Sequence, residues 1–178
     1  MFDININNKI VEESKKFIGQ KEIKGNLGFL DKIFEEYMKT VGWKKSHPWC
    51  AYFSELVWKL AYAQIDSTYV EKLSGLFSGS VMATWDNFSD NNEFNVDQSP
   101  DKGSLIVWNS YSNSKSTKFG HIGILIDYDG DKLTTVEGNT NSQGGREGIE
   151  VAKKKRILNF NTPQNGLKLL GFIHPFQP

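Results

Sequence analysis

The sequence predicts an α+β fold in which N-terminal helices pack on a C-terminal antiparallel β-sheet of about five strands. Two changes in pattern along the chain support this. Over residues 1–65, apolar residues recur every three or four positions, as they do in amphipathic helices. From Gly103 onward, short β-type runs are separated by turn sequences such as "DGD" and "QGG". Because 178 residues suit one domain with a core of its own, we expect a single domain over residues 1–178.

The helical part of the chain is divided by residues that begin or end helices. Gly19 and Gly42 each follow an amphipathic segment, at positions where glycine commonly terminates a helix. Pro48 suits the first turn of the next helix. The predicted helices cover residues 9–18, 28–41, 49–63 and 81–88.

Polar stretches separate the predicted strands. Residues 89–102, rich in Asp, Asn, Ser and Pro, are expected to form a loop, and residues 109–118 a long surface loop. The predicted strands are "SLIVW" (104–108), "HIGILIDY" (121–128), "KLTTVEG" (132–138), "GIEVAKKKR" (148–156) and "LLGFIHP" (169–175).

Charge and cysteine content exclude several classes of function. Lys plus Arg and Asp plus Glu both total 21, so no net field attracts nucleic acid or an anionic membrane, and neither is expected as a partner. No apolar run is long enough to span a bilayer. A single cysteine forms no internal disulfide and no CxxC metal or redox site, and we expect neither a metal nor a cofactor. The N-terminal residues lack the basic start and apolar run of a signal peptide, so we expect synthesis in the cytoplasm.

Cys50 is the first candidate for chemistry. It lies at the expected start of the third helix, where unsatisfied backbone N–H groups and the helix dipole favour an anion such as a thiolate. The alternative is structural, since Cys50 also falls three residues before Phe53 on the apolar stripe of that helix. The position alone does not decide between a nucleophile and a core residue.

A thiol nucleophile needs a base, and the chain has three histidines. His121 opens a predicted strand, His47 lies in the loop before Cys50, and His174 is expected to be a surface or packing residue. The next strand ends with Glu137 and Asn139, and pairing through the "DYDGDK" hairpin would bring Glu137 towards His121. Alternatively, these two residues are a solvated strand-end carboxylate and a turn amide.

Four segments taken in order, "PWCAYF", "GSLIVW", "GHIGIL" and "VEGNT", resemble the CHAP family, the cysteine- and histidine-dependent amidohydrolases and peptidases that cut bacterial cell walls. The resemblance extends over residues 17–175 and implies a papain-like fold. It implies Cys50 as nucleophile, His121 as base, Glu137 as the residue that orients it, and Asn139 as an accompanying polar residue. One departure is Ser104, since the family usually has Gly-Asp where this chain has Gly-Ser.

The resemblance further implies hydrolysis of a peptidoglycan amide, either within the peptide or at the muramyl-alanine bond. Candidate walls of the substrate cleft are Trp43, His47, Trp49 and Trp85, each of which can instead pack in the core. Loops 109–118 and 140–148 are expected to shape the groove. The sequence does not identify the bond that is cut.

We expect a monomer that reaches the periplasm or cell wall by export or lysis-linked release, as a phage lysin or as secreted cargo with an immunity protein. Two rival functions remain open at this point. One is a thiol deamidase or acyltransferase of the same fold that acts on a protein. The other is a non-catalytic wall-binding or tail-associated structural protein.

Overall fold

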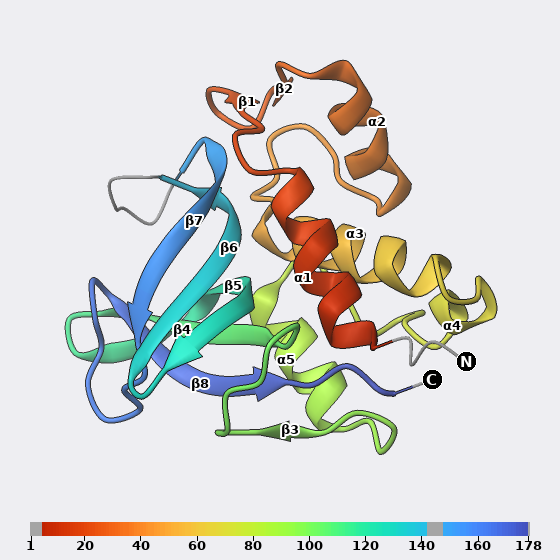
Figure 1. The fold of residues 1–178 in the computed structure, drawn as a ribbon. Helices are drawn as coiled ribbons and strands as arrows, with labels where there is room; N and C mark the ends of the chain where they lie inside the picture. Colours follow the sequence, from red (N-terminus) through yellow and green to blue (C-terminus); the bar gives the residue numbers. More distant parts are fainter. Residues whose placement is uncertain (1–4, 142–147, 178) are drawn as a thin grey trace.

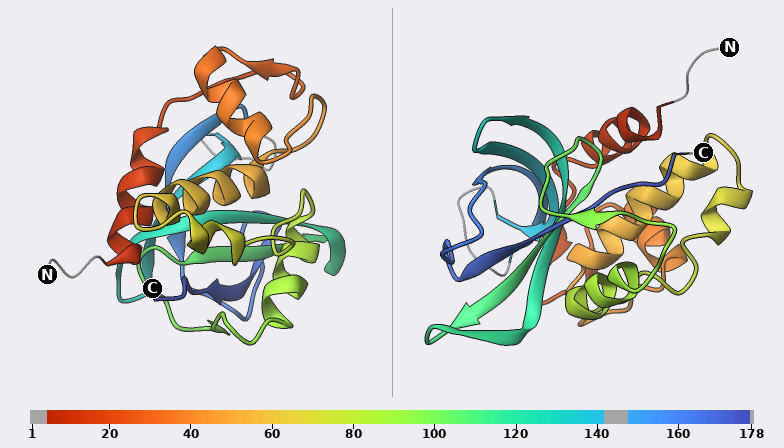
Figure 2. Two further views of the ribbon diagram at one scale, coloured as in Figure 1. Left: turned by 90° about the vertical axis from the view of Figure 1, so that its right-hand side faces the viewer. Right: turned by 90° about the horizontal axis from the view of Figure 1, so that it is seen from below.

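The computed structural model describes residues 5–141 and 148–177 (Figure 1). Its helices are α1 (Ile6–Lys16), α2 (Lys32–Thr40), α3 (Cys50–Ala63), α4 (Thr68–Glu71) and α5 (Val81–Ser89). Its strands are β1 (Glu22–Ile23), β2 (Gly28–Phe29), β3 (Val96–Asp97), β4 (Leu105–Ser112), β5 (Lys115–Asp129), β6 (Lys132–Thr140), β7 (Glu150–Ile157) and β8 (Leu167–Ile173). The helices lie against one face of a curved sheet (Figure 2), which confirms the predicted α+β architecture.

The main sheet has six strands in the order β3-β8-β4-β5-β6-β7, and all of its pairings are antiparallel. The strand beyond the five predicted is β3, which pairs Val96 with Ile173 at one edge of the sheet. It lies in the stretch expected to be a loop, because two residues are too few to display a period-2 pattern. Strands β4, β5 and β6 are neighbours, and this order determines which side chains meet at the site.

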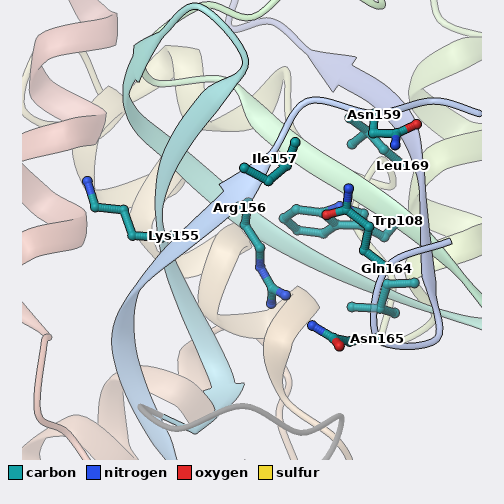
Figure 3. A pocket seen from close by; sticks show the side chains of 9 residues that line it. Trp108, Lys155, Arg156, Ile157, Asn159, Gln164, Asn165 and Leu169 are labelled. Carbon is teal, nitrogen blue, oxygen red and sulfur yellow. The ribbon is translucent and has the colours of Figure 1, made fainter. Parts of the chain in front are cut away.

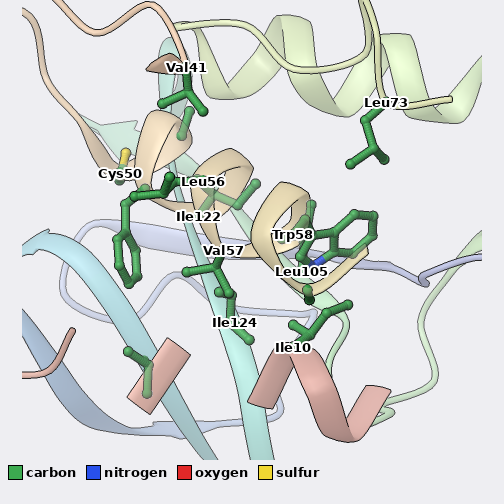
Figure 4. Packing of buried hydrophobic residues seen from close by; sticks show 14 of the residues in the cluster. Ile10, Val41, Cys50, Leu56, Val57, Trp58, Leu73, Leu105, Ile122 and Ile124 are labelled. Atoms are coloured by element: carbon green, nitrogen blue, oxygen red, sulfur yellow. The ribbon is translucent and has the colours of Figure 1, made fainter. Parts of the chain in front are cut away.

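Helix α3 is the central element of the core. It packs on α1 and on strands β5 and β6, and its buried residues include Leu56, Val57 and Trp58 (Figure 4). Each such side chain contributes roughly 1.5–3 kcal/mol on burial. Cys50 lies at the margin of this cluster in Figure 4, so the first turn of α3 is where the core meets the surface.

The opposite face of the sheet carries a smaller apolar cluster of its own. Leu158 and Phe160, which follow β7, pack against it. Its buried members are Ile106, Trp108, Leu125, Leu133, Leu167, Leu169 and Phe172. The sheet is therefore apolar on both faces, and the side chains of successive residues along one strand belong to different clusters.

The predicted long loop at 109–118 is wrong. Strand β4 continues to Ser112 and β5 begins at Lys115, so the connection is only the two residues Asn113 and Ser114. Both have positive φ, 50° and 61°, as in the two-residue turns that join twisted strands. The segment is polar because this hairpin, green to teal in Figure 2, extends beyond the core.

The predicted start of the second helix is also wrong. Helix α2 begins at Lys32, and the Asp31 carboxylate caps it by accepting from the backbone N–H groups of Ile33 and Phe34 at 2.8 and 3.2 Å. Gly28–Phe29 pairs with β1 instead of joining the helix. The apolar residue Ile33 is 71% exposed, because the face that packs on the core carries Phe34.

Candidate active site

The start of α3 is fixed by the tryptophan that precedes it. Trp49 is fully buried, its ring lies 5.0 Å from that of Phe29, and its Nε1–H donates to Glu22 Oε2 at 2.5 Å. Cys50 follows as the first residue of the helix and is 7% exposed. The buried side chain of Trp49 thus anchors the first turn of α3 in the core, whereas the thiol of Cys50 lies at the margin of the core.

The C-terminal end of β6 packs against the first turn of α3. A Cβ at Gly138 would lie 2.7 Å from Phe53 Cβ and 2.7 Å from Trp49 Cζ3, so only glycine lets the first turn of α3 approach the strand this closely. The next residue, Asn139, has φ of 53° and accepts a hydrogen bond from the Trp49 backbone N–H at 2.8 Å. Its amide donates to the Gly148 carbonyl at 2.7 Å. Asn139 therefore ties β6 to the helix start and makes no hydrogen bond to His121.

His121 and Glu137 lie side by side on β5 and β6, with His121 Nε2 2.8 Å from Glu137 Oε2. The antiparallel pairing expected for these strands is present. Gly123 provides the space, because a Cβ there would lie 2.6 Å from Glu137 Cγ. Cys50 and His121 line the same cavity, and the interaction of the imidazole with the thiol contributes to raising the pKa of His121. Because Nε2 is engaged by the carboxylate, Nδ1 is the nitrogen available to the sulfur.

Two further residues bind the Glu137 carboxylate, and neither was identified from the sequence. Arg156 on β7 donates from Nε to Oε1 at 2.8 Å and from Nη2 to Oε2 at 2.5 Å. Thr135 donates from Oγ1 to Oε1 at 2.5 Å. The Trp108 ring lies next to both charged neighbours, 5.8 Å from the His121 ring and 5.1 Å from the Arg156 guanidinium carbon. Glu137, which has no exposed surface, is thus enclosed by donors.

The charged forms of His121 and Glu137 stabilise each other. Burial disfavours the imidazolium, but the hydrogen bonds and charges of Cys50 and Glu137 outweigh it and raise the pKa of His121 to about 9. Burial also opposes ionisation of Glu137, yet Arg156 and His121 hold the pKa of its carboxyl far below the ordinary value. At neutral pH the histidine is therefore an imidazolium, the partner that a thiolate requires.

A cavity of about 570 Å³ opens at Cys50 and His121. One wall comes from Gly79 and the start of α5, and another from β5, where Lys118 Nζ lies 5.4 Å from the Phe119 ring centroid. The lining residues are Pro48, Cys50, Gly79, Ser80, Val81, Lys118, Phe119, Gly120, His121 and Asn139. Cys50 and His121 therefore face one shared cavity.

The four aromatic residues predicted to form the cleft walls do not line this cavity. Trp43 is 3% exposed and donates to the His47 carbonyl, and Trp49 is buried as described above, so both are core residues. Trp85 packs against the core near Gly171 of β8. His47 is exposed in the loop before the site. Of the loops expected to shape the groove, Lys118 at the end of the first contributes, and most of the second, including its "QGG" turn, lies at 142–147, outside the described residues.

A second histidine cluster, which is only partly buried, has a structural role. His174 lies between Ser104 and Asp97, with Nδ1 2.8 Å from Ser104 Oγ and Nε2 2.9 Å from Asp97 Oδ1. Ser104 has no exposed surface, so no substrate can reach its hydroxyl. The serine that departs from the family pattern thus anchors the end of β8, as expected for a packing role of His174.

Within residues 5–141 and 148–177, no group of three or more His, Cys, Asp or Glu side chains is arranged to hold a metal ion. In the same part of the chain, no helix has the length and apolarity needed to cross a membrane.

The fold and the Cys-His-Glu arrangement define a papain-like α+β protein with a thiol at a helix start and a histidine on a strand. The family model described as CHAP domain matches residues 42–139, more than half of the chain. The protein belongs to the CHAP domain family, which supports hydrolase activity of the peptidoglycan amidase or peptidase type. The match includes Cys50, His121, Glu137 and Asn139 but ends before Arg156. No curated protein and no solved structure matches the chain.

Proposed function

We propose that the protein hydrolyses an amide bond in the peptide part of peptidoglycan, with Cys50 as nucleophile and His121 and Glu137 as its catalytic partners. The observation that carries this proposal is that Cys50 and His121 line one cavity while His121 is hydrogen-bonded to the buried Glu137. The three residues come from three different elements, so their meeting is a property of the whole fold and not of a local motif.

The reaction starts from the thiolate–imidazolium pair that forms when the Cys50 proton moves to His121. The Cys50 thiolate attacks the carbonyl carbon, and the carbonyl oxygen takes the negative charge of a tetrahedral intermediate. The imidazolium of His121 then gives its Nδ1 proton to the leaving nitrogen, the C–N bond breaks, and a thioester with Cys50 remains. Neutral His121 next takes a proton from water, whose oxygen attacks the thioester and releases a carboxylic acid and the thiolate.

The helix start provides stabilisation for the intermediate. Cys50 is the first residue of α3, and the first four N–H groups of a helix lack partners within it. The backbone N–H of Cys50 is therefore a donor that can face the oxyanion, aided by the positive end of the helix dipole. Asn139 acts through the backbone, since it holds the turn at Trp49 from which this N–H projects.

Two glycines, Gly79 and Gly120, form part of the cavity wall. A Cβ at Gly79 would lie 2.5 Å from Tyr52 Oη, and one at Gly120 would lie 2.6 Å from the Trp108 carbonyl oxygen. Backbone therefore forms these parts of the wall, and an extended substrate can approach it closely. Phe119 adds an apolar surface and Lys118 a cation that can pair with a substrate carboxylate.

We propose one catalytic domain over residues 1–178, acting as a monomer in the periplasm or on the wall after export or lysis-linked release. An immunity partner would accompany it if it is secreted cargo.

The test is to incubate purified peptidoglycan sacculi with wild type and Cys50→Ala and to identify the released fragments by mass spectrometry. Only the wild type should release fragments, and their new termini distinguish an endopeptidase from a muramyl-alanine amidase. His121→Ala should be as inactive as Cys50→Ala. Intact sacculi with wild-type protein would refute the proposal.

The same experiment separates the two rivals. Wild-type protein that leaves sacculi intact but is labelled at Cys50 by iodoacetamide near neutral pH would favour a thiol deamidase or acyltransferase. Binding to sacculi without fragments and without enhanced labelling would favour a structural wall-binding protein.

A further inference from the structure

Arg156 is the one cation in contact with the catalytic carboxylate other than His121 among the residues that the structure describes. It lies on β7, where its backbone pairs with Leu133, and its side chain runs along the sheet to reach Glu137. Both carboxylate oxygens accept from the guanidinium, at 2.8 and 2.5 Å. A two-pronged contact of this kind fixes the rotation of the carboxylate as well as its position.

The count of charges indicates what Arg156 contributes. With Arg156 and Glu137 both ionised, their charges cancel, so an imidazolium at His121 is balanced only by a thiolate at Cys50. Without the guanidinium, Glu137 and the imidazolium would balance each other, and the thiol would keep its proton. Because the group is buried, an uncompensated charge is strongly disfavoured, so the charge of Arg156 influences the balance between thiol and thiolate; the nearby Lys154 donates to the Asn141 carbonyl and not to Glu137.

Trp108 maintains the geometry of this group. Its ring lies at 28° to the His121 ring and beneath the guanidinium carbon of Arg156. The indole therefore packs against both cations, and the Glu137 carboxylate contacts both of them. Packing against an aromatic face also favours a guanidinium over an ammonium group at this position.

We propose that Arg156 is a positioning residue of the catalytic system, which holds Glu137 oriented towards His121 and so promotes the thiolate of Cys50. This rests on the proposed function for its link to hydrolysis. Its effect on the thiol itself does not depend on the substrate.

A second cavity makes the proposal testable by chemical rescue. It has a volume of about 190 Å³ and is lined by Trp108 and Arg156 together with residues of β7, β8 and the segment between them (Figure 3). Truncation of Arg156 to alanine would add the space of the guanidinium to this cavity, where a small cation from solution can bind. Lys155 is the matched control, because it lines the same cavity but is directed away from Trp108 in Figure 3 and donates to Thr134 at 2.8 Å.

The first measurement is the rate at which iodoacetamide alkylates Cys50, the only cysteine, as a function of pH. Arg156→Ala should slow alkylation at pH 6.5 by about 10-fold and move its onset to higher pH, because the thiolate is the reactive form. Guanidinium at non-denaturing concentration should restore most of the rate in Arg156→Ala and leave Lys155→Ala unchanged. Arg156→Gln, which keeps more of the side-chain volume, serves if the alanine variant fails to fold.

The second measurement is hydrolysis of peptidoglycan. Arg156→Ala should lower kcat by about 10- to 100-fold with little change in KM, as expected when a residue supports a catalytic group without contacting substrate. In a Glu137→Gln background, the Arg156 substitution should cause no comparable further loss.

Unchanged alkylation in a folded Arg156 variant, or equal losses with and without Glu137, would overturn the proposal. Failure of rescue by guanidinium together with full activity of Arg156→Gln would do the same. If wild type leaves peptidoglycan intact while alkylation responds as described, the proposed function fails and the role of Arg156 stands.

Discussion

Glu137→Gln isolates the charge of the carboxylate, because glutamine has nearly the same shape. In the protein, Cys50 and Glu137 together raise the pKa of His121 to about 9 against the opposing effect of burial. Relative to the ordinary 6.5, this corresponds to roughly 3 kcal/mol in favour of the imidazolium. With the carboxylate gone, burial is opposed by Cys50 alone and Arg156 becomes an unpaired neighbouring cation. We therefore expect the pKa of His121 to fall below 6.5.

Glu137→Gln should also change the tautomer of His121, which affects catalysis directly. A glutamine amide can donate to Nε2, which stabilises the neutral tautomer that carries its proton on Nδ1. His121 then points an N–H at a neutral thiol, and both the ion pair and the acceptor for the thiol proton are lost. We expect kcat/KM to fall by about 100- to 1,000-fold, and alkylation of Cys50 at neutral pH to slow.

The assay is an NMR titration of the imidazole signals, which is simple because the chain has three histidines. Glu35→Gln is the control, since Glu35 is another buried carboxylate, held by Lys32 and the backbone N–H of Phe29 on the separate α2 region. It should lower stability without altering the titration of His121. A His121 signal that still titrates near pH 9 in Glu137→Gln, with unchanged alkylation, would refute the reasoning.

The same shift predicts a pH dependence of stability. Because the folded-state pKa of His121 is raised, its contribution is complete below about pH 6.5 and is lost as pH rises through about 9. Urea unfolding of wild type should therefore show a decline in stability over this interval, and Glu137→Gln should lack most of it. A parallel decline in both proteins would assign the effect to other groups.

Three further substitutions test the backbone around the site. Gly123→Ala places a Cβ 2.6 Å from Glu137 Cγ and should lower kcat/KM by about 10- to 100-fold with a near-normal melting curve, so an unchanged rate would contradict the spacing argument. Gly138→Ala meets the first turn of α3 at 2.7 Å and should cost about 1–3 kcal/mol in urea unfolding, with full stability as the refuting result. Asn139→Ala removes the acceptor for the backbone N–H of Trp49 and should cost about 1–2 kcal/mol, whereas Asn139→Asp, which keeps an acceptor, should lose less; equal losses would count against the hydrogen bond.

The meeting of His121 and Glu137 could be anticipated because a hairpin constrains it. Two adjacent strands joined by a short turn have few possible registers, and the alternation of side chains then determines which residues share a face. The helix start at Cys50 was similarly local, since it depended on Pro48 and on the apolar spacing that follows.

Arg156 could not be identified by such reasoning. It ends a run of basic residues, "KKKR", and no local feature tells which of them turns inward. The register of β7 against β6 depends on a connection of several residues, so it cannot be counted from a tight turn. The positions of the tryptophan side chains could not be predicted for a different reason. Pro48 and Cys50 line the cavity while Trp49 between them faces the core, and composition does not record the direction of a side chain at a helix start.

Charge balance explains why Arg156, on the third strand β7, belongs to this site. Proton transfer between Cys50 and His121 leaves the total charge of the buried group unchanged, provided that Glu137 and Arg156 remain paired. Both the thiol–imidazole and the thiolate–imidazolium states are then compatible with burial, which is what a reaction that passes between them requires. Removing Arg156 leaves an excess negative charge whenever the ion pair forms, and removing Glu137 removes the group through which Arg156 acts on His121. The effects of the two substitutions on the thiol should therefore not add when combined.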